Sequence, residues 1–407
     1  MKTYVLFITN PWNFPKWDKI SNPTKYNIVL IVNEKCFNAL KESDKKLITE
    51  IYKTEDFGFE NLRLIIKNQI LPKYKNILII TSHELLLLTC AKLREHFEVE
   101  GDKVKDISPF RDKIIMKQKL EKLGVLPKYL KFSPQEFLKR KDKYVNQIID
   151  HLGLPVFVKP IAFGGSMDCK KIDHKEDLTN WCIDNINSDK EFEIDEFISG
   201  ETYHCDSIIR DKKTLHVGIG KYITSVYRFL YGAPNGSIIV PEDDPDIPLF
   251  KEFNQRIISA FEYIPNGTTH LQFFKTSENR LIFIEIAARP PGGLISQMYQ
   301  KHANIDYITL HHMLQMNLDF DLQLKRGPYA AFFCFPHQKG KVSAIHEPTY
   351  LKSKYKFEPK VKIGDVLNEP KFLLDIAAEL LLWNENYQEL FQDFISLTEY
   401  KVISVED

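Results

Sequence analysis

The sequence lacks the features that would assign it to several common classes of protein. Its 407 residues include 6 cysteines, which form no C-x-x-C pair and no Cys/His cluster with zinc-ligand spacing, so we expect reduced cysteines rather than disulfides or zinc. Lys+Arg and Asp+Glu are both 55, and the missing basic excess argues against a nucleic-acid partner. No stretch approaches the ~20 apolar residues of a membrane span. We therefore expect a cytoplasmic protein with no membrane and no nucleic-acid partner.

Two frequent nucleotide-binding motifs are also missing. Gly218 and Gly220 form a lone G-x-G without a third glycine. No G-x-x-x-x-G-K-[ST] phosphate loop occurs anywhere in the chain. These absences disfavour a Rossmann dinucleotide site and a P-loop.

The composition that is present predicts a globular α/β protein of two or three domains, with 43% hydrophobic and 27% charged residues over 407 positions. Short apolar runs at 4–9, 28–32 and 77–81 predict parallel strands covered on both faces. The segment 83–97 predicts a helix after the third run. Further along, the pattern predicts these elements: a helix at 111–124, strands at 155–160 and 191–201, a hairpin at 270–275 and 280–287, a helix at 302–316, and strands with a helix near 372–383.

A lysine and a glycine-rich loop lie together in the first half of the chain. Lys159 ends a predicted strand, and Gly164, Gly165 and Ser166 follow in a small-residue loop. A lysine supplies a point charge for phosphate oxygens, and glycines let backbone N–H groups approach a polyphosphate. The alternative is a surface lysine near an ordinary turn.

The predicted hairpin brings two oxygen-bearing side chains together. In a register that pairs Gln272 with Glu285 or Phe283, the side chains of Gln272 and Glu285 point to the same sheet face as His270. Two oxygen donors on one face suit Mg²⁺ bound to a nucleotide. The alternative is that Glu285 is a buried carboxylate paired with Arg289.

The hairpin ends in Arg289, which two prolines and two glycines follow. An arginine held in this way is a stiff donor for an anionic transition state or a carboxylate, although an ordinary strand-to-loop turn would look the same. His204 and Cys205 are neighbours, but consecutive strand residues face opposite ways, so a nucleophile pair is disfavoured. Asp206 is expected on the nucleotide side of the sheet. Lys221 is either a pocket residue or an exposed strand lysine.

The chain contains, in this order, Lys113, Lys159, Gly164, Gly165, Ser166, Asp195, Glu196, Phe197, Ile198, Glu201, Gln272, Glu285 and Arg289. This order resembles the ATP-grasp superfamily, most closely its carboxylate-amine ligase and biotin carboxylase-like branch, and within it the L-amino acid ligases. The resemblance covers roughly residues 108–317.

The resemblance implies an α/β (α+β) ATP-grasp fold in three parts. A Rossmann-like pre-ATP-grasp domain would span 1–107. The ATP-grasp domain would span 108–320, with a small lobe at about 108–195 and a large lobe at about 196–320. An α+β part at 321–407 would pack on the large lobe.

The resemblance also implies a role for each site residue. Lys113 and Lys159 would hold the α- and β-phosphates of ATP, with Gly164, Gly165 and Ser166 in a closing lid. Asp195 or Glu196, with Phe197 and the backbone around Ile198, would meet the adenine edge, and Glu201 would take the ribose hydroxyls. Gln272 and Glu285 would bind Mg²⁺, with Mn²⁺ as an alternative ion. Arg289 would be catalytic and would stabilise charge on the phosphoryl and acyl groups.

The implied function is ligation of a small-molecule carboxylate, preferably an amino acid, to an amine through an acyl phosphate, with release of ADP and phosphate. A carboxylase-like or thiol-ligating enzyme and a non-catalytic nucleotide-binding homologue stay open as alternatives, and the resemblance also allows a homodimer. The chain departs from the family pattern at two positions. Gln272 stands where many members have glutamate, and Ala287 stands where many have asparagine.

Overall fold

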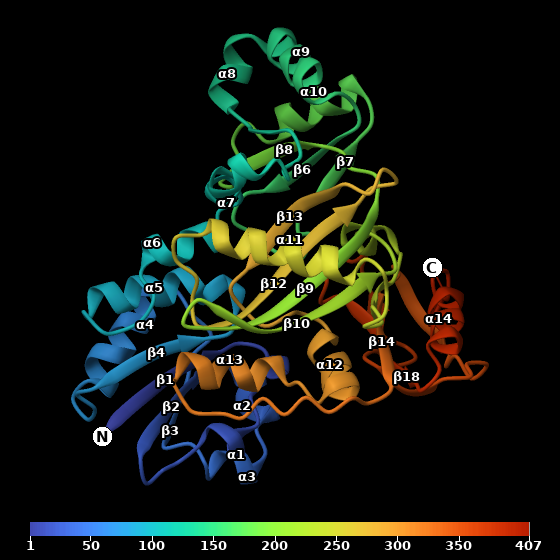
Figure 1. Cartoon of the computed structure of the whole chain (residues 1–407). Helices are drawn as coiled ribbons and strands as arrows, with labels where there is room; N and C mark the ends of the chain where they lie inside the picture. The colour runs from blue at the N-terminus through green and yellow to red at the C-terminus, as the bar shows by residue number, and fades with distance from the viewer. Residues whose placement is uncertain (407) are drawn as a thin grey trace.

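The computed structural model describes residues 1–406 and begins with a parallel sheet (Figure 1). Strands β1 (Lys2–Ile8), β2 (Tyr26–Val32), β3 (Glu50–Lys53) and β4 (Ile77–Thr81) lie in the order β3-β2-β1-β4, and every pair is parallel. Two separate apolar clusters cover the two faces of this sheet, which explains why its strands are apolar without alternation. The predicted open α/β unit is confirmed.

Short helices connect and flank these strands. The predicted helix 83–97 is a 3₁₀ turn at Glu84–Leu86 followed by α5 (Leu87–His96). The other helices of this region are α1 (Trp17–Ile20), α2 (Glu34–Ala39), α3 (Glu42–Lys45), α4 (Phe59–Ile65) and α6 (Val104–Ile107).

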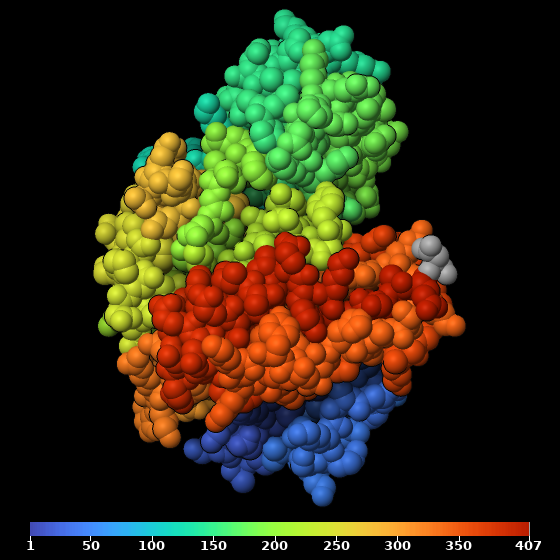
Figure 2. Space-filling view, turned by 90° about the vertical axis from the view of Figure 1, so that its right-hand side faces the viewer, coloured from blue at the N-terminus to red at the C-terminus, as the bar shows by residue number. Residues whose placement is uncertain are grey.

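A small antiparallel sheet follows and stands above the rest of the molecule (Figures 1 and 2). Its order is β5-β8-β6-β7, and the outer face carries an apolar cluster beneath three helices. The strands and helices are β5 (Tyr129–Lys131), β6 (Val156–Pro160), β7 (Lys170–Ile172), β8 (Phe192–Glu196), α8 (Pro134–Lys139), α9 (Lys141–Leu152) and α10 (Lys175–Asp184). The strand predicted at 191–201 is shorter than expected, because β8 leaves the sheet after Glu196.

The largest sheet has eight strands in the order β13-β12-β9-β10-β11-β14-β18-β16, and all of its pairs are antiparallel. Its strands are β9 (Glu201–Arg210), β10 (Lys213–Tyr222), β11 (Asn235–Ile239), β12 (Gly267–Lys275), β13 (Leu281–Ala287), β14 (Tyr329–Pro336), β16 (Lys354–Pro359) and β18 (Ile376–Asn384). Strands β14, β16 and β18 of the C-terminal part therefore share this sheet with the large lobe, and Figure 2 shows residues 321–406 across the middle of the molecule. The domain boundaries stay a prediction.

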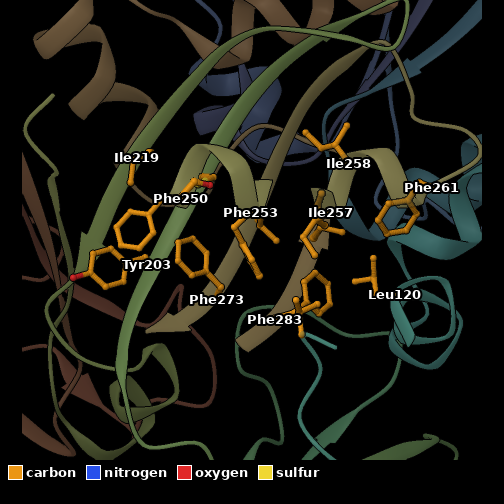
Figure 3. Packing of buried hydrophobic residues seen from close by; sticks show 14 of the residues in the cluster. Leu120, Tyr203, Ile219, Phe250, Phe253, Ile257, Ile258, Phe261, Phe273 and Phe283 are labelled. Atoms are coloured by element: carbon orange, nitrogen blue, oxygen red, sulfur yellow. The ribbon is translucent and has the colours of Figure 1, made fainter. Parts of the chain in front are cut away.

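Helices cover both faces of the large sheet. Helix α11 (Ile247–Ala260) packs aromatic residues against Phe273 of β12 and Phe283 of β13 (Figure 3). Helices α12 (Ile295–Ala303) and α13 (Tyr307–Gln315) lie on the other face. At Gly218 a Cβ would come within 2.4 Å of the Tyr299 ring, so this glycine of the lone G-x-G serves helix packing.

Two of the predicted helices differ in the structure. The helix near 372–383 is wrong, because Ile376–Asn384 is strand β18 between β14 and β16. Its leucines and alanines favour a helix locally, but pairing on both sides of the strand outweighs that preference. The helix actually follows, as α14 (Tyr387–Ser396). The helix at 302–316 begins only at Tyr307, because Asn304 adopts a left-handed conformation and ends α12.

The remaining elements are α7 (Lys113–Leu120), described with the site below, and a three-stranded sheet of β15 (Gly340–Ile345), β17 (Val366–Leu367) and β19 (Ile403–Glu406). Among the helices of residues 1–406, none is long and apolar enough to cross a membrane.

Candidate active site

A cleft between the small sheet and the hairpin β12–β13 collects most of the predicted site residues. It offers about 830 Å³ of space, open solvent at its mouth included. The predicted residues that line it are Lys113, Lys159, Gly164, Gly165, Ser166, Asp195, Glu196, Phe197, Ile198, Gln272 and Glu285. Aromatic side chains such as Phe157, Tyr227 and Phe274 supply apolar wall between them.

The small-lobe side of the cleft holds a buried group of four charges. In the register of β6 and β8, Lys159 lies opposite Glu193, and its Nζ is 3.1 Å from Glu193 Oε1 and 3.0 Å from Asp195 Oδ2. From α7, Lys117 Nζ reaches Glu193 at 3.1 Å and Asp195 at 2.5 Å and lies 4.6 Å from the centre of the Tyr129 ring. We name Lys117, Lys159, Glu193 and Asp195 the charge cluster. The Asp195 side chain is thus committed to lysines.

These contacts control ionisation within the charge cluster. Burial acts to raise the pKa of Asp195, but the charges of Lys117 and Lys159 outweigh it and hold that pKa below its usual value. Burial acts to lower the pKa of Lys159, yet Asp195 and Glu193 raise it well above the ordinary range. Lys159 is therefore a permanent cation at the cleft wall.

Lys113 joins the small-lobe side to the hairpin. It is the first residue of α7, whose N-terminus is capped by the Asp112 side chain accepting from two backbone N–H groups. Its Nζ donates to the Phe163 carbonyl at 2.6 Å and lies 3.3 Å from Glu285 Oε2. The alternative pairing of Glu285 with Arg289 is therefore wrong, since Lys113 is the cation beside this carboxylate.

The loop after β6 curves over the cleft. Gly165 has a φ of +68°, and Ser166 and Asp168 adopt left-handed φ values of 57° and 55°. Left-handed conformations in succession produce a compact turn, and non-glycine residues adopt them at some cost. The loop lies in reach of the cleft and of Glu84, because a Cβ on Gly164 would meet Glu84 Oε1 at 2.9 Å.

The two predicted metal ligands lie side by side on the hairpin. Gln272 pairs directly with Glu285, and a bulge follows at Phe273. Both side chains line the cleft, and both offer oxygen atoms, which suits a hard divalent cation that takes its other ligands from phosphate and water. The donor set therefore fits Mg²⁺.

Arg289 lies beyond the hairpin, outside the set of cleft-lining residues, where it meets a residue that the sequence analysis missed. Its Nη2 is 2.7 Å from Glu84 Oε2, and Glu84 Oε1 accepts from Arg111 Nη1 at 2.5 Å. Burial acts to raise the pKa of Glu84, but the two arginines hold it well below the usual range. The available signal was position, because Glu84 follows the carboxyl end of β4, where ligands of open α/β sheets bind.

Glu201 also lies outside the cleft-lining set. It begins β9, where its carboxylate is 2.5 Å from Lys221 Nζ and accepts from the Tyr203 hydroxyl at 2.8 Å. Burial acts to raise the pKa of Glu201, but these two hydrogen bonds lower it. Lys221 is thus occupied by an ion pair where β9 begins and β10 ends.

The neighbours His204 and Cys205 face opposite sides of β9, as the alternation predicts. Cys205 packs with Phe250 in the apolar cluster beneath α11. His204 and Asp206 face the other way, toward His270 of β12. Burial raises the pKa of the Cys205 thiol well above its usual value, so it is no nucleophile.

Comparisons with known proteins agree with this geometry. The family model described as D-ala D-ala ligase C-terminus matches residues 120–315. The L-arginine-specific L-amino acid ligase of Bacillus subtilis is 28% identical over 325 residues, which are 77% of this chain and 76% of that protein. The D-alanine--D-alanine ligase of Bacillus velezensis is 26% identical over 223 residues, 53% of this chain and 62% of that enzyme.

Solved structures match over almost the whole length. The L-amino acid ligase from Bacillus licheniformis superposes with a TM-score of 0.73 at 16% identity and covers 100% of this chain and 99% of its own. The N5-carboxyaminoimidazole synthetase from Staphylococcus aureus complexed with ADP superposes with a TM-score of 0.67 at 15% identity. The match covers 98% of this chain and 97% of that protein. A biotin carboxylase domain from Hydrogenobacter thermophilus, solved with MgADP, superposes with a TM-score of 0.64 at 15% identity. The match covers 98% of this chain and 90% of that domain.

Both of these last two structures hold ADP, and the second holds it with magnesium. The predicted ATP-grasp fold is confirmed along the full chain, from the N-terminal parallel sheet to the antiparallel sheets that enclose the cleft. The chain therefore has the fold of the ATP-grasp superfamily and is similar in sequence to amino acid ligases.

Proposed function

We propose that this protein is an ATP- and Mg²⁺-dependent amino acid ligase that forms a peptide bond. The observation that carries the proposal is one cleft lined by two lysines, a glycine-rich loop and an adjacent Gln–Glu pair, in a chain whose relatives are amino acid ligases. A carboxylate is a poor electrophile, so it must be activated before an amine can attack it. Phosphoryl transfer needs mainly positioning and charge neutralisation, which these side chains offer.

The reaction has two balanced steps. A carboxylate oxygen of the first amino acid attacks the γ-phosphorus of ATP, and the bond to ADP breaks. The amine nitrogen of the second amino acid then attacks the acyl carbon, loses a proton and displaces phosphate. Each step moves negative charge between oxygens, so fixed cations near the reacting groups lower both barriers.

The two lysines are assigned to the phosphates of the nucleotide. Lys113 and Lys159 are both buried side chains whose ammonium groups reach the cleft, and each is held by a carboxylate. Such preorganised cations need little rearrangement when phosphates arrive. Gly164, Gly165 and Ser166 would close over the phosphates from the loop after β6.

The adenine base of ATP would lie at the end of β8. Asp195 uses its carboxylate in the charge cluster, so its backbone, with Glu196 and the Phe197–Ile198 segment, is assigned to the adenine edge. Glu201 is assigned to the ribose hydroxyls, because it lies at the start of the next strand with its carboxylate half-exposed.

Gln272 and Glu285 would hold Mg²⁺, which when bound neutralises charge on the phosphates. Arg289 is assigned to charge that develops on the phosphoryl and acyl groups. Glu84 of the N-terminal region positions Arg289 through paired contacts at 2.8 Å to Nε and 2.7 Å to Nη2. Both nitrogens donate to one oxygen, Glu84 Oε2, and this shared contact restricts the orientation of the guanidinium.

The test is release of ADP and phosphate with a panel of amino acids, alone and in pairs, with dipeptides identified by mass spectrometry. Only an amide-forming enzyme consumes amine in step with ADP release, which separates it from a carboxylase-like or thiol-ligating enzyme. Glu285→Ala should abolish turnover, whereas Glu278→Ala in the exposed hairpin turn should not. Binding of ATP with no ADP release in any mixture would instead show a non-catalytic protein.

The expected homodimer is a separate proposal. Light scattering on the purified full chain measures the mass in solution, and a mass near 47.6 kDa would contradict it.

A further inference from the structure

A buried polar network lies directly beneath Gln272, on the large-lobe side of the cleft. Asp206 accepts at Oδ1 from His270 Nδ1 at 2.7 Å and at Oδ2 from His204 Nδ1 at 2.6 Å. The opposite nitrogen of His270, Nε2, is 3.0 Å from Gln272 Nε2, which also donates to the Tyr222 hydroxyl at 2.9 Å. Asp206 and His204 are completely buried, so water cannot replace these partners.

The network determines which ring nitrogen of His270 carries the proton. An ionised carboxylate only accepts, so the nitrogen that faces Asp206 must be the donor. In neutral imidazole the other nitrogen is then an acceptor. His270 Nε2 therefore presents a lone pair to the Gln272 amide.

This lone pair discriminates between the two ends of the amide. If the NH₂ group faces His270 and Tyr222, it donates to both. If the amide is turned over, its carbonyl oxygen meets the lone pair of His270 Nε2, and two acceptors face each other at 3.0 Å. The favoured orientation turns the carbonyl oxygen away from the network, toward the side of the cleft where Glu285 lies.

We propose that His270 is a positioning residue, which Asp206 holds in the Nδ1–H tautomer so that the carbonyl oxygen of Gln272 faces the metal. The inference rests on the proposed function, because it concerns how the metal ligand is presented. A glutamate ligand has two equivalent oxygens and needs no such device. A glutamine ligand has one oxygen, so its orientation decides whether it binds metal or repels it.

The histidine and aspartate side chains could be mistaken for a metal site, since their ligand atoms lie within 4.8 Å of one another. The separations of 2.6 and 2.7 Å, however, are those of strong hydrogen bonds, and each Nδ1 already uses its proton on a carboxylate oxygen. The three side chains therefore act on Gln272 rather than bind an ion.

Two substitutions of His270 separate positioning from simple burial. In His270→Gln the terminal amide stands near the former Nε2 and can offer an oxygen to Gln272, but it loses the contact with Asp206. In His270→Asn the amide stands near the former Nδ1 and can donate to Asp206, but it cannot reach Gln272. Ser207→Ala is the matched control. Ser207 is fully buried on β9 next to Asp206, but its hydroxyl contacts Asn254 and not the histidines.

The measured quantity is the Mn²⁺ affinity of the full-length protein with ADP, from the electron paramagnetic resonance of free Mn²⁺, alongside the affinity for ADP in EDTA. His270→Asn should weaken Mn²⁺ binding about 10- to 100-fold, as loss of an outer-sphere partner typically does, with ADP affinity in EDTA nearly unchanged. His270→Gln should retain most of the Mn²⁺ affinity, and Ser207→Ala all of it. The reverse order of the two His270 variants would show that the histidine only satisfies Asp206, and would overturn the proposal.

A second measurement needs no substitution in the tested protein. Nitrogen-15 NMR of histidine-labelled protein, with His270 identified by its missing signal in a variant, should show the proton on Nδ1 and not on Nε2. A proton on Nε2 would overturn the proposal even if metal binds. If the wild-type protein binds no Mn²⁺–ADP while the tautomer is as expected, the proposed function fails and the tautomer control by Asp206 stands.

Discussion

The two sides of the cleft are stabilised by different kinds of polar interaction. On the small-lobe side, the charge cluster places two ammonium groups against two carboxylates with contacts of 2.5–3.1 Å. On the large-lobe side, one buried carboxylate, Asp206, is held by two histidines and no lysine or arginine. Burial lowers the pKa of His270, although the charge of Asp206 acts to raise it.

The difference matches what each side must bind. Phosphates require cations, and an isolated buried lysine would lose its proton unless carboxylates kept it charged. A divalent cation requires oxygen atoms pointed at it, and a hydrogen-bond network without lysine or arginine can set their direction. Two lysine charges therefore lie where phosphates are expected, whereas on the large-lobe side a hydrogen-bonded network surrounds the amide expected to bind metal.

The largest effect should follow from breaking the charge cluster. Lys117→Met leaves Glu193 and Asp195 with one lysine between them, so the free energy of unfolding should fall by about 3–5 kcal/mol, as for one partner removed from a buried ion pair. Urea unfolding measures this change. Lys119→Met is the control. Lys119 lies on the same helix as Lys117 but pairs with the exposed Glu262, so its substitution should change the free energy of unfolding by under about 1 kcal/mol. Equal effects of the two substitutions would contradict the cluster's role.

The next effect concerns Arg289, the fixed charge beyond the hairpin. Arg289→Lys loses the paired contact with Glu84, and kcat for ATP-dependent dipeptide formation should fall about 10²- to 10³-fold. The KM for ATP should change little, because Lys113 and Lys159 are assigned to the phosphates. Arg280→Lys, at the exposed hairpin turn, is the control and should keep wild-type kcat. A selective rise in KM for ATP would place Arg289 on the nucleotide instead.

Acid should destabilise the large lobe before the small lobe. Burial lowers the pKa of His311 to about 3, and His311 Nδ1 accepts from the Thr268 backbone N–H at 3.1 Å. The unfolded chain takes up this proton near pH 6.5 and the folded chain does not, so stability falls as pH drops from 6.5 toward 3. By contrast, the carboxylate of Asp195 stays ionised in the folded state and loses its contribution only below about pH 4.

At pH 5 the His311 contribution amounts to about 2 kcal/mol. Urea unfolding at pH 7.5 and pH 5 should show the loss, and His311→Gln should reduce the difference by about that amount. An unchanged pH dependence in the variant would mean that His311 is protonated in the folded protein.

The smallest effect should come from the ion pair between Glu201 and Lys221, where β9 begins and β10 ends. Glu201 and Lys221 form a partly exposed pair, so Glu201→Gln should change the free energy of unfolding by under about 1 kcal/mol. If Glu201 meets the ribose, the KM for ATP should rise about tenfold, the value of one hydrogen bond to a charged group. A KM equal to that of the wild type would remove Glu201 from the nucleotide site.

Much of the fold follows from local pattern. The apolar runs of β1, β2 and β4, the hairpin β12–β13 and the glycine loop after β6 are all marked by residues within a few positions of each other. Strand β18 was missed because its leucines and alanines suit a helix, and only its two neighbours in the sheet make it a strand. The pairing of Glu285 with Arg289 was wrong for a similar reason, since the cation that reaches Glu285 comes from a distant helix.

The sequence by itself determined the order of the lysines, the glycine loop and the Gln–Glu hairpin along the chain. Strand alternation and a short turn are enough to place Gln272 beside Glu285, because both lie in one hairpin. Only the tertiary structure decided that Glu84 holds Arg289, which lies 205 positions away, and that Asp206 of β9 holds His270 of β12. No local periodicity links such residues, because their proximity depends on how sheets and domains pack. Their partners therefore become visible only when the chain is folded.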